Sequence, residues 1–345
     1  MNELIFYPLV FLASFILTYL IVPFNIKLSI ISGVVDKPHD RGIHKKIMPL
    51  SGGLSFSLVI LVVSFLTTYF VDSINYRNNV ISTALGGFFI VVLGFADDKV
   101  KLSAFFKLTF QILIVIFLYY SGIKIDKITN PFGNDLILGN FSLPITILWF
   151  LLIINAINLI DGIDGMATGI AVIVNTVLFL VGVMYNNLFL TTLSLICVAS
   201  YLAFLKYNFY PAKIFMGDSG SLFIGYFLAA ISIYGNKQYK GITAMTLLIP
   251  IISLFIPLMD TVMAVFRRIK KGNNIFIADK LHYHHKMLEF GFTQDKICII
   301  SYFITFLFGL IAFGFTFAPK QVLILIFFLL AIILTLIFYN LIRRS

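Results

Sequence analysis

The sequence is short of charge. Asp, Glu, Lys and Arg make up 12% of its 345 residues, about half of the roughly 25% that is usual in soluble proteins. Hydrophobic residues make up 60% of the chain, and the mean hydropathy is +1.02. So few charges cannot cover a water-exposed surface, which excludes a soluble globular protein. Lipid must therefore be the main solvent of a polytopic membrane protein.

Cysteine is scarce, and signals for processing or for separate domains are missing. Cys197 and Cys298 both lie in apolar stretches, which excludes a disulfide framework and predicts buried small hydrophobic side chains. Residues 1–24 lack a basic region and a small-residue cleavage site, so we interpret them as a first span rather than a removed signal. Without repeats or low-complexity tracts, residues 1–345 are expected to form a single integral membrane domain.

Long apolar runs, in contrast, occupy most of the chain. A bilayer core of roughly 30 Å needs about 20 apolar residues per helix. The stretches that approach this requirement are 4–24, 52–71, 80–96, 104–120, 142–160, 167–184, 188–205, 219–234, 242–264, 297–317 and 321–341. We therefore predict an all-α polytopic fold with about eleven transmembrane helices. The ninth should be broken at Pro250 and Pro257, and residues 122–141 should form a small outer hairpin.

The basic residues predict how the chain is oriented. Nineteen of the 25 Lys and Arg residues fall in one set of loops, which the positive-inside rule assigns to the cytoplasm. The N-terminus is then outside, in a multi-pass protein of the plasma or inner membrane. This topology accounts for the net charge of +10, so nucleic-acid binding is not expected. All five histidines and eleven of the fifteen acidic residues share the cytoplasmic side, which indicates a metal-and-phosphate site there.

An adjacent acidic pair, Asp97-Asp98, follows the third apolar stretch. Neighbouring carboxylates at a membrane surface repel each other, and a divalent cation such as Mg²⁺ is the usual compensation. A solvated pair neutralised by Lys99 and Lys101 is an equally good interpretation of this motif alone.

A second motif, NAINLIDGIDGMA, joins the fifth and sixth stretches. Its Asn158, Asp161 and Asp164 are three residues apart, so in a helix they would share a face. Gly162 and Gly165 would allow a ligand to approach the backbone. Regular polar spacing of this kind favours a binding site over a simple connection.

A third motif, KYNFYPAKIFMGDSGS, opens the eighth stretch. Asp218 lies where a helix should begin, so it is either a helix N-cap or part of a metal or phosphate site that uses the helix dipole. Asn208 and Phe215 are near enough in sequence to hydrogen-bond and stack on a base. The motif alone does not decide between these roles.

Histidines and lysines dominate two further cytoplasmic segments. IADKLHYHHK contains His282, His284 and His285, which suit a pyrophosphate or a transition metal. A histidine-rich surface loop without a role is the alternative. In DKPHDRGIHKKIMPLSGG, Lys46 is either a phosphate contact or a topogenic charge, and Pro49 begins a tight turn into a helix.

The ordered set of motifs resembles that of one protein family. The matching pieces are P-x-x-G-G at 49–53, Asp97-Asp98 followed by LSAFFKL, NLIDGIDGMA, NFYPAKIFMGDSGS, PLMDTVMAVFRR and DKLHYHH. The set is similar to that of the polyprenyl-phosphate N-acetylhexosamine-1-phosphate transferases, in the branch of the undecaprenyl-phosphate N-acetylglucosaminyl-1-phosphate transferases. One departure is Lys280, where that branch often has Arg, so a point charge replaces a bidentate fork.

The resemblance implies a reaction, two substrates and a metal. The enzyme would transfer N-acetylhexosamine-1-phosphate, with N-acetylglucosamine favoured, from a UDP-N-acetylhexosamine to undecaprenyl phosphate in the bilayer, releasing UMP. This step starts a lipid-linked glycan of the cell envelope. The cofactor would be Mg²⁺, with Mn²⁺ as an alternative, and a homodimer is left open. Direct attack is favoured over a covalent aspartyl intermediate, which the sequence also leaves open.

The resemblance also implies a role for each matching residue. Asp218 would ligate the metal, and Asp97, Asp98 and His282 would be catalytic. The substrate-binding residues would be Lys46, Lys107, Asn158, Asp161, Asp164, Asn208, Phe215, His284 and His285.

Three other functions fit parts of the sequence. A transporter would need ionisable residues near the bilayer midplane, whereas here they gather on one side. A CDP-alcohol phosphotransferase would need an arginine that DGIDGMA lacks. A phospho-N-acetylmuramoyl-pentapeptide transferase is the nearest alternative, and the HYHH sequence argues against it by resemblance.

Overall fold

The chain folds into a bundle of long helices. The structure, a computed structural model, describes residues 3–37, 47–128, 136–234, 247, 250–255, 258, 287–314, 322–323 and 325–333. The helices are α1 (Glu3–Ser32), α2 (Gly52–Thr67), α3 (Ile74–Val100), α4 (Ala104–Tyr120), α5 (Ser142–Ile160), α6 (Met166–Met184), α7 (Leu188–Asn208), α8 (Gly217–Tyr234) and α12 (Gln294–Gly314). The remaining elements are β1 (Val35–Asp36), β2 (Met48–Pro49), β3 (Lys127–Ile128), β4 (Leu136–Ile137) and the short 3₁₀ helix η1 (Gly139–Phe141).

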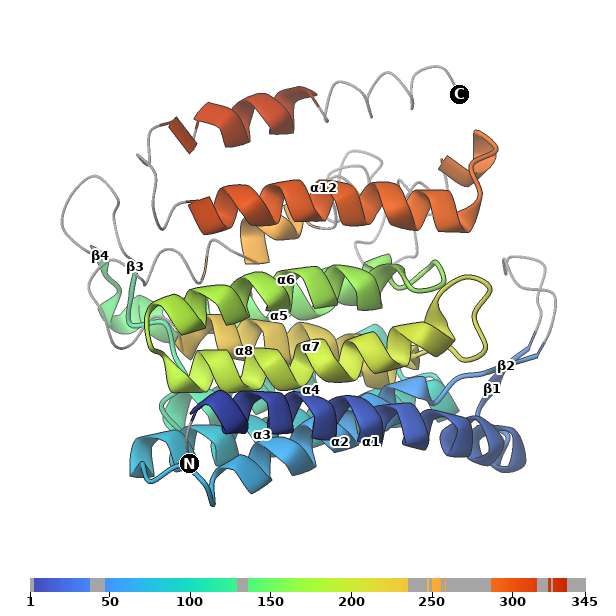
Figure 1. The fold of residues 1–345 in the computed structure, drawn as a ribbon, viewed down its shortest axis with the longest axis horizontal. Helices are drawn as coiled ribbons and strands as arrows, with labels where there is room; N and C mark the ends of the chain where they lie inside the picture. Colours follow the sequence, from blue (N-terminus) through green and yellow to red (C-terminus); the bar gives the residue numbers. More distant parts are fainter. Residues whose placement is uncertain are drawn as a thin grey trace.

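The helices lie side by side, with one small hairpin at each end of the bundle. Figure 1 shows β1 and β2 at one end and β3 and β4 at the other. Among the described residues, six helices are long and apolar enough to cross a membrane, and α2, α4 and α8 are shorter apolar helices. The predicted all-α membrane fold is confirmed at this level.

Most of the predicted spans are helices, and the described residues do not reach all of them. Every predicted stretch up to 219–234, and also 297–317, corresponds to a helix. The stretches 242–264 and 321–341 lie partly outside the described residues, so the count of eleven and the broken ninth helix stay predictions. Within 122–141, β3 and β4 pair antiparallel, with Lys127 opposite Ile137, as a hairpin requires.

The first helix is longer than its apolar run. The sequence predicts an end near residue 24, whereas α1 continues through Pro23 to Ser32. Its added turns carry polar side chains that are buried by tertiary contacts. The Asn25 amide donates to the Ser51 carbonyl at 2.7 Å, and the Ser29 hydroxyl accepts from the Leu50 amide at 3.2 Å. Hydropathy alone misses these turns because their burial is polar.

Helix α8 lies at the centre of the packing, in contact with α2, α3 and α5. Its Phe223, Tyr226 and Phe227 are buried. In lipid, helices associate mainly through close van der Waals packing, which small residues allow. A Cβ on Gly94 of α3 would lie 2.5 Å from the Asp218 carbonyl, and one on Gly53 of α2 would lie 2.2 Å from the Gly220 nitrogen. The backbones of α2 and α3 therefore press directly against the first turn of α8.

Candidate active site

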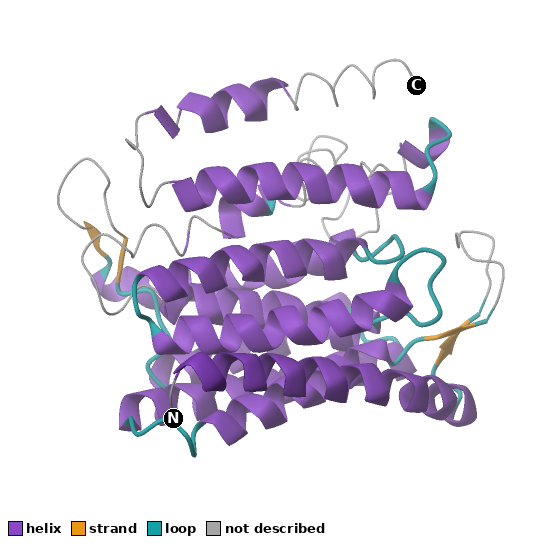
Figure 2. Cartoon of the chain, viewed as in Figure 1, coloured by secondary structure: helices purple, strands orange, loops and turns teal. Residues whose placement is uncertain are grey.

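The polar motifs meet at one end of the bundle. Helices α3, α5 and α7 end there, α4 and α8 begin there, and the β1–β2 hairpin lies at the same end. We call this the motif end, and the end that carries β3 and β4 the opposite end. Figure 2 shows the loops that join these helices gathered at the two ends. Residues far apart in sequence thus become neighbours.

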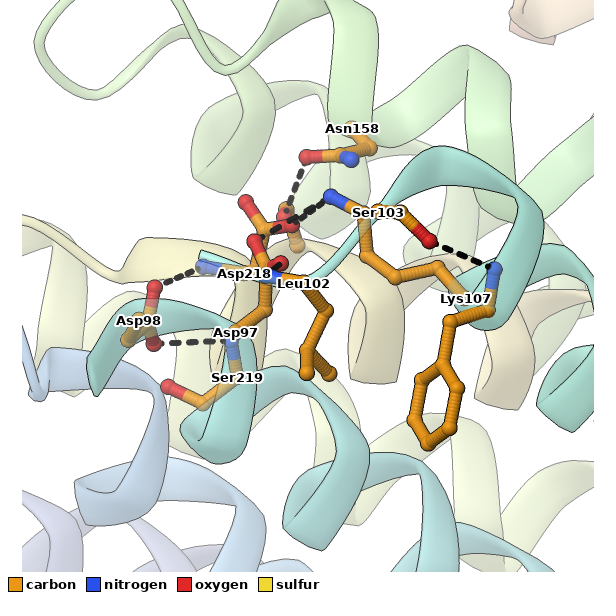
Figure 3. A network of polar contacts seen from close by, with 10 residues as sticks. Asp97, Asp98, Leu102, Ser103, Lys107, Asn158, Asp218 and Ser219 are labelled. Carbon is orange, nitrogen blue, oxygen red and sulfur yellow. Dashed lines mark hydrogen bonds and ion pairs between the residues drawn. The ribbon is translucent and has the colours of Figure 1, made fainter. Parts of the chain in front are cut away.

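Lys107 joins two aspartates from different helices. Its ammonium nitrogen lies 2.8 Å from Asp218 Oδ2 and 3.1 Å from Asp97 Oδ2 (Figure 3). The other Asp97 oxygen accepts from the Leu102 amide at 2.8 Å. One cation from the first turn of α4 therefore holds the end of α3 and the start of α8 together.

Asp98 caps the N-terminus of α8. Its Oδ1 accepts from the Asp218 amide at 2.7 Å and its Oδ2 from the Ser219 amide at 3.1 Å (Figure 3). A carboxylate here satisfies two amides that have no partner within the helix and interacts favourably with the helix dipole. Gly217, at φ +67°, leaves the space this cap needs, because a Cβ there would lie 2.5 Å from Asp98 Oδ2.

The DGIDG turn, residues 161–165, corrects one expectation about the second motif. A shared helix face was predicted for Asn158, Asp161 and Asp164, but α5 ends at Ile160, and Asp161 and Asp164 lie in the turn that follows. The turn reaches Gly165 at φ +79°, a conformation that favours glycine. The prediction fails because the helix ends at Ile160, before Asp161 and Asp164, and the chain then turns through Gly165 into α6.

Asp161 and Asp164 have different surroundings within this turn. Asp164 Oδ2 accepts from the Ala212 amide at 2.9 Å, which joins the turn to the segment before α8. Asp161 is half-buried and makes no hydrogen bond or ion pair with another described residue. Burial, followed by the negative charges of Asp218, Asp98 and Asp164, raises the pKa of Asp161 well above its usual value.

The remaining predicted substrate-contact residues differ in their burial and in their hydrogen bonds. The Asn158 oxygen accepts from the Ser221 hydroxyl at 2.9 Å. Asn208 is buried, donates to the Ile214 carbonyl at 3.0 Å and accepts from the Thr168 hydroxyl at 2.9 Å, so it anchors the segment before α8. Phe215 is half-buried. Direct contact with a substrate remains a prediction for all three.

Four predicted site residues cannot be placed. Lys46, His282, His284 and His285 lie outside the described residues, so their roles stay predictions.

A backbone connection beside Asp218 was missed at the sequence level. The Phe215 amide donates to the Pro49 carbonyl at 2.9 Å, and the Gly52 and Gly53 amides donate to the Phe215 and Met216 carbonyls at 2.9 and 2.8 Å. The P-x-x-G-G motif signalled a tight turn, but its spacing contains nothing that identifies its partner. The turn fixes the chain just before Asp218.

Carboxylates outnumber the cations that are ion-paired with them in the cluster around Asp218. Lys107 is the one cation that forms ion pairs with Asp97 and Asp218 among the described residues, and Asp98, Asp161 and Asp164 lie nearby. In the same part of the chain, no three acidic, histidine or cysteine side chains form a complete metal cluster. Mg²⁺ commonly takes one or two carboxylates and fills its other positions with water and phosphate oxygens. Asp218 with a neighbouring carboxylate fits that pattern.

The chain is similar to proteins of one family over most of its length. The model of glycosyl transferase family 4 matches residues 80–236. A probable undecaprenyl-phosphate N-acetylglucosaminyl 1-phosphate transferase of Bacillus subtilis (strain 168) is 37% identical over 328 residues, 95% of this chain and 90% of the relative. A decaprenyl-phosphate N-acetylglucosaminephosphotransferase of Mycobacterium tuberculosis (strain ATCC 25618 / H37Rv) is 30% identical, over 82% of this chain and 75% of the relative. An undecaprenyl-phosphate alpha-N-acetylglucosaminyl 1-phosphate transferase of Escherichia coli (strain K12) is 28% identical, over 92% and 87%.

Proposed function

The chain belongs to glycosyl transferase family 4, and on this premise we propose that it transfers N-acetylhexosamine-1-phosphate from a UDP-sugar to undecaprenyl phosphate. N-acetylglucosamine is the favoured sugar, because the B. subtilis relative that is 37% identical carries it in its name. The product would be the first lipid-linked intermediate of a cell-envelope glycan. The motif end would face the cytoplasm, as the positive-inside rule predicts, with the N-terminus outside.

The observation that carries the proposal is the Lys107 bridge between Asp97 and Asp218. Transfer between two phosphates must overcome the repulsion of two anions, so positioning and neutralisation supply most of the catalysis. Lys107 is 23% exposed and presents a positive charge at the motif end of the bundle. A lipid phosphate that approaches from the bilayer would find this ammonium group beside carboxylates suited to a metal ion.

We infer that Asp218, assisted by Asp97 or Asp161, holds Mg²⁺, with Mn²⁺ as a substitute. When bound, the ion would neutralise pyrophosphate oxygens and stabilise the leaving UMP. Asp98 keeps the first turn of α8, and hence the Asp218 backbone, in a fixed position. Burial and the neighbouring carboxylates raise the pKa of Asp161, and a bound cation would lower it again by stabilising the ionised form.

The environment of the Asp97-Asp98 pair supports direct attack by the lipid phosphate. Both Asp98 oxygens accept hydrogen bonds from backbone amides. Asp97 is 5% exposed, and its oxygens accept hydrogen bonds from Lys107 and from the Leu102 amide. A covalent nucleophile needs an accessible lone pair. A phosphate with a second pKa of about 6 is largely ionised at pH 7 and needs no strong base. Its oxygen would bond to the β-phosphorus while the bond to the UMP oxygen breaks.

The proposal is tested by UMP release from purified protein with undecaprenyl phosphate and a panel of UDP-sugars. We expect turnover with UDP-N-acetylglucosamine, loss of turnover in EDTA and recovery with Mg²⁺. Preference for UDP-N-acetylgalactosamine would change the sugar and keep the reaction. Turnover only with UDP-N-acetylmuramoyl-pentapeptide, or with no UDP-sugar, would reject the proposal, and EDTA-resistant turnover would reject the metal.

A further inference from the structure

Helix α12 contacts the DGIDG turn through one row of side chains. Gln294, Cys298 and Tyr302 are spaced four residues apart, so they lie on the same face of α12. The Asp164 amide donates to Gln294 Oε1 at 3.4 Å, Cys298 Sγ donates to the Asp164 carbonyl at 3.2 Å, and the Tyr302 hydroxyl donates to the Gly165 carbonyl at 2.6 Å. The row therefore contacts the turn through three backbone atoms.

Helix α6 packs closely against the same face of α12. Gly169 lies one turn into α6, and a Cβ there would come within 2.1 Å of the Tyr302 ring. Figure 1 shows α12 beside α6, on the side of α6 away from α7. The absence of a side chain at position 169 lets the Tyr302 ring approach α6 closely enough for its hydroxyl to reach Gly165. Cys298 is buried, as its sequence context predicts, and its thiol is used as a donor.

The turn that α12 contacts carries two carboxylates of the site. Asp161 lies near Asp218 and Asp98, and Asp164 is already joined to Ala212 by its side chain. The Ala212 contact and the α12 row together approach the turn from two sides. Helix α12 lies outside residues 80–236, the part of the chain that the family model matches.

We propose that Gln294, Cys298 and Tyr302 are positioning residues that fix the DGIDG turn for binding the nucleotide part of the UDP-sugar. The inference rests on the proposed function. The row does not touch the substrate; it sets where the Asp161 and Asp164 carboxylates stand. A row that served only to pack α12 would affect protein stability and leave nucleotide affinity unchanged.

The test removes single hydrogen-bond donors with small changes to each side chain. Tyr302→Phe and Cys298→Ala each delete one hydrogen bond to the turn, whereas Cys298→Ser keeps a donor. Losing one such bond should raise the Kd for UDP and the KM for the UDP-sugar about 5-fold. The KM for undecaprenyl phosphate and kcat should change less than about 2-fold, because uniform binding is what is lost. Cys298→Ser should recover most of the affinity that Cys298→Ala loses.

The matched control is Tyr120→Phe, which deletes a hydroxyl from a 77% exposed ring at the opposite end of the bundle. It should leave UDP affinity unchanged. Hydrogen exchange of the peptide that covers residues 161–169 reports the turn directly, and it should be faster in Tyr302→Phe than in the wild type or the control. Faster exchange with unchanged UDP affinity would overturn the proposal, as would unchanged exchange.

The two proposals can fail separately. Wild-type protein that binds UDP but turns over no UDP-sugar would reject the transferase function, while the difference in UDP affinity between Tyr302→Phe and wild type would still decide the role of the row. Absence of UDP binding to the wild type would overturn both.

Discussion

Two lysines at opposite ends of this bundle form ion pairs with aspartates at similar distances. At the opposite end, Lys124 contacts Asp126 at 3.1 Å, with side chains 35% and 53% exposed. At the motif end, Lys107 contacts Asp97 at 3.1 Å and Asp218 at 2.8 Å, with the two carboxylates 7% and 24% exposed. The N–O distances are similar at the two ends, so they do not distinguish a structural ion pair from a functional site. The two ends differ in the burial of the carboxylates and in the sharing of one lysine by two carboxylates.

The difference in burial predicts a difference in cost. An exposed ion pair contributes about 0–1 kcal/mol to stability, so the Lys124–Asp126 pair can be broken cheaply. Carboxylates withdrawn from water are expensive unless they are paired, and the motif end holds more carboxylates than bonded cations among the described residues. We propose that a cation bound between phosphates offsets the cost of keeping these carboxylates together.

The largest effect is expected at Asp218. Asp218→Asn removes the proposed metal ligand and the stronger contact of Lys107, so UMP release should fall by about 1,000-fold or more. Asp126→Asn makes the same chemical change at the opposite end and should leave the rate within about 2-fold. Both rates are measured on purified protein whose helix content is checked by circular dichroism. A folded Asp218→Asn protein with most of its activity would remove Asp218 from the site.

Gly94→Ala should have the next largest effect. Its Cβ would meet the Asp218 carbonyl at 2.5 Å, so α3 and the start of α8 must separate. A shift of about 1 Å in a catalytic group can cost about 100-fold in rate, and the thermal midpoint should also fall. Gly314→Ala is the control, since among the described residues its Cβ would meet only the Leu323 side chain, at 3.3 Å. Equal activities for these two variants would show that the contact between α3 and α8 does not set the site.

Lys107→Met tests the shared cation. It leaves Asp97 and Asp218 without their common partner, and we expect a loss of UMP release of about 100-fold, the lower end of the range for a removed electrostatic stabiliser. Lys124→Met should change the rate less than about 2-fold. If both variants behaved alike, the comparison between the two ends would lose its meaning.

The smallest effect is expected at two buried asparagines. Comparing them separates an effect on the position of the site residues from an effect on protein stability. Asn25, at the motif end, holds the Ser51 carbonyl, and Asn187, at the opposite end, caps α7 by accepting from the Leu190 amide. Replacing either by Ala should lower stability by about 1 kcal/mol. Only Asn25→Ala should also lower UMP release, by about 5-fold, because Ser51 precedes the glycines bonded to Phe215 and Met216. Thermal unfolding and turnover of the pair separate the two effects, and a similar loss of turnover in Asn187→Ala would contradict this account.

The sequence predicted the positions of helices that depend on hydropathy. It predicted less accurately the segments whose conformation depends on polar contacts. The helices of the described residues follow the apolar runs, but α1 outlasts its run because Asn25 and Ser29 are buried by hydrogen bonds to residues 50–55. The predicted shared helix face of Asp161 and Asp164 was wrong because α5 ends at Ile160 and both residues lie in the turn that leads into α6.

The site could be predicted as a set of residues but not as an arrangement. The motifs assigned Asp97, Asp98, Lys107 and Asp218 to one site, since their order along the chain resembles a known family. The structure brings these residues together, and their roles stay predictions. That Asp98 caps α8, or that Cys298 contacts Asp164, depends on contacts between residues more than 100 positions apart. No local pattern contains that information.

Binding of Mn²⁺ to the purified protein, followed by electron paramagnetic resonance, tests the central claim most directly. The account predicts a bound Mn²⁺ signal that is present in the wild type and Asp126→Asn, strengthens when UDP is added, and disappears in Asp218→Asn. An Asp218→Asn protein that binds Mn²⁺ as the wild type does would contradict the claim that the carboxylates of the motif end hold the cation.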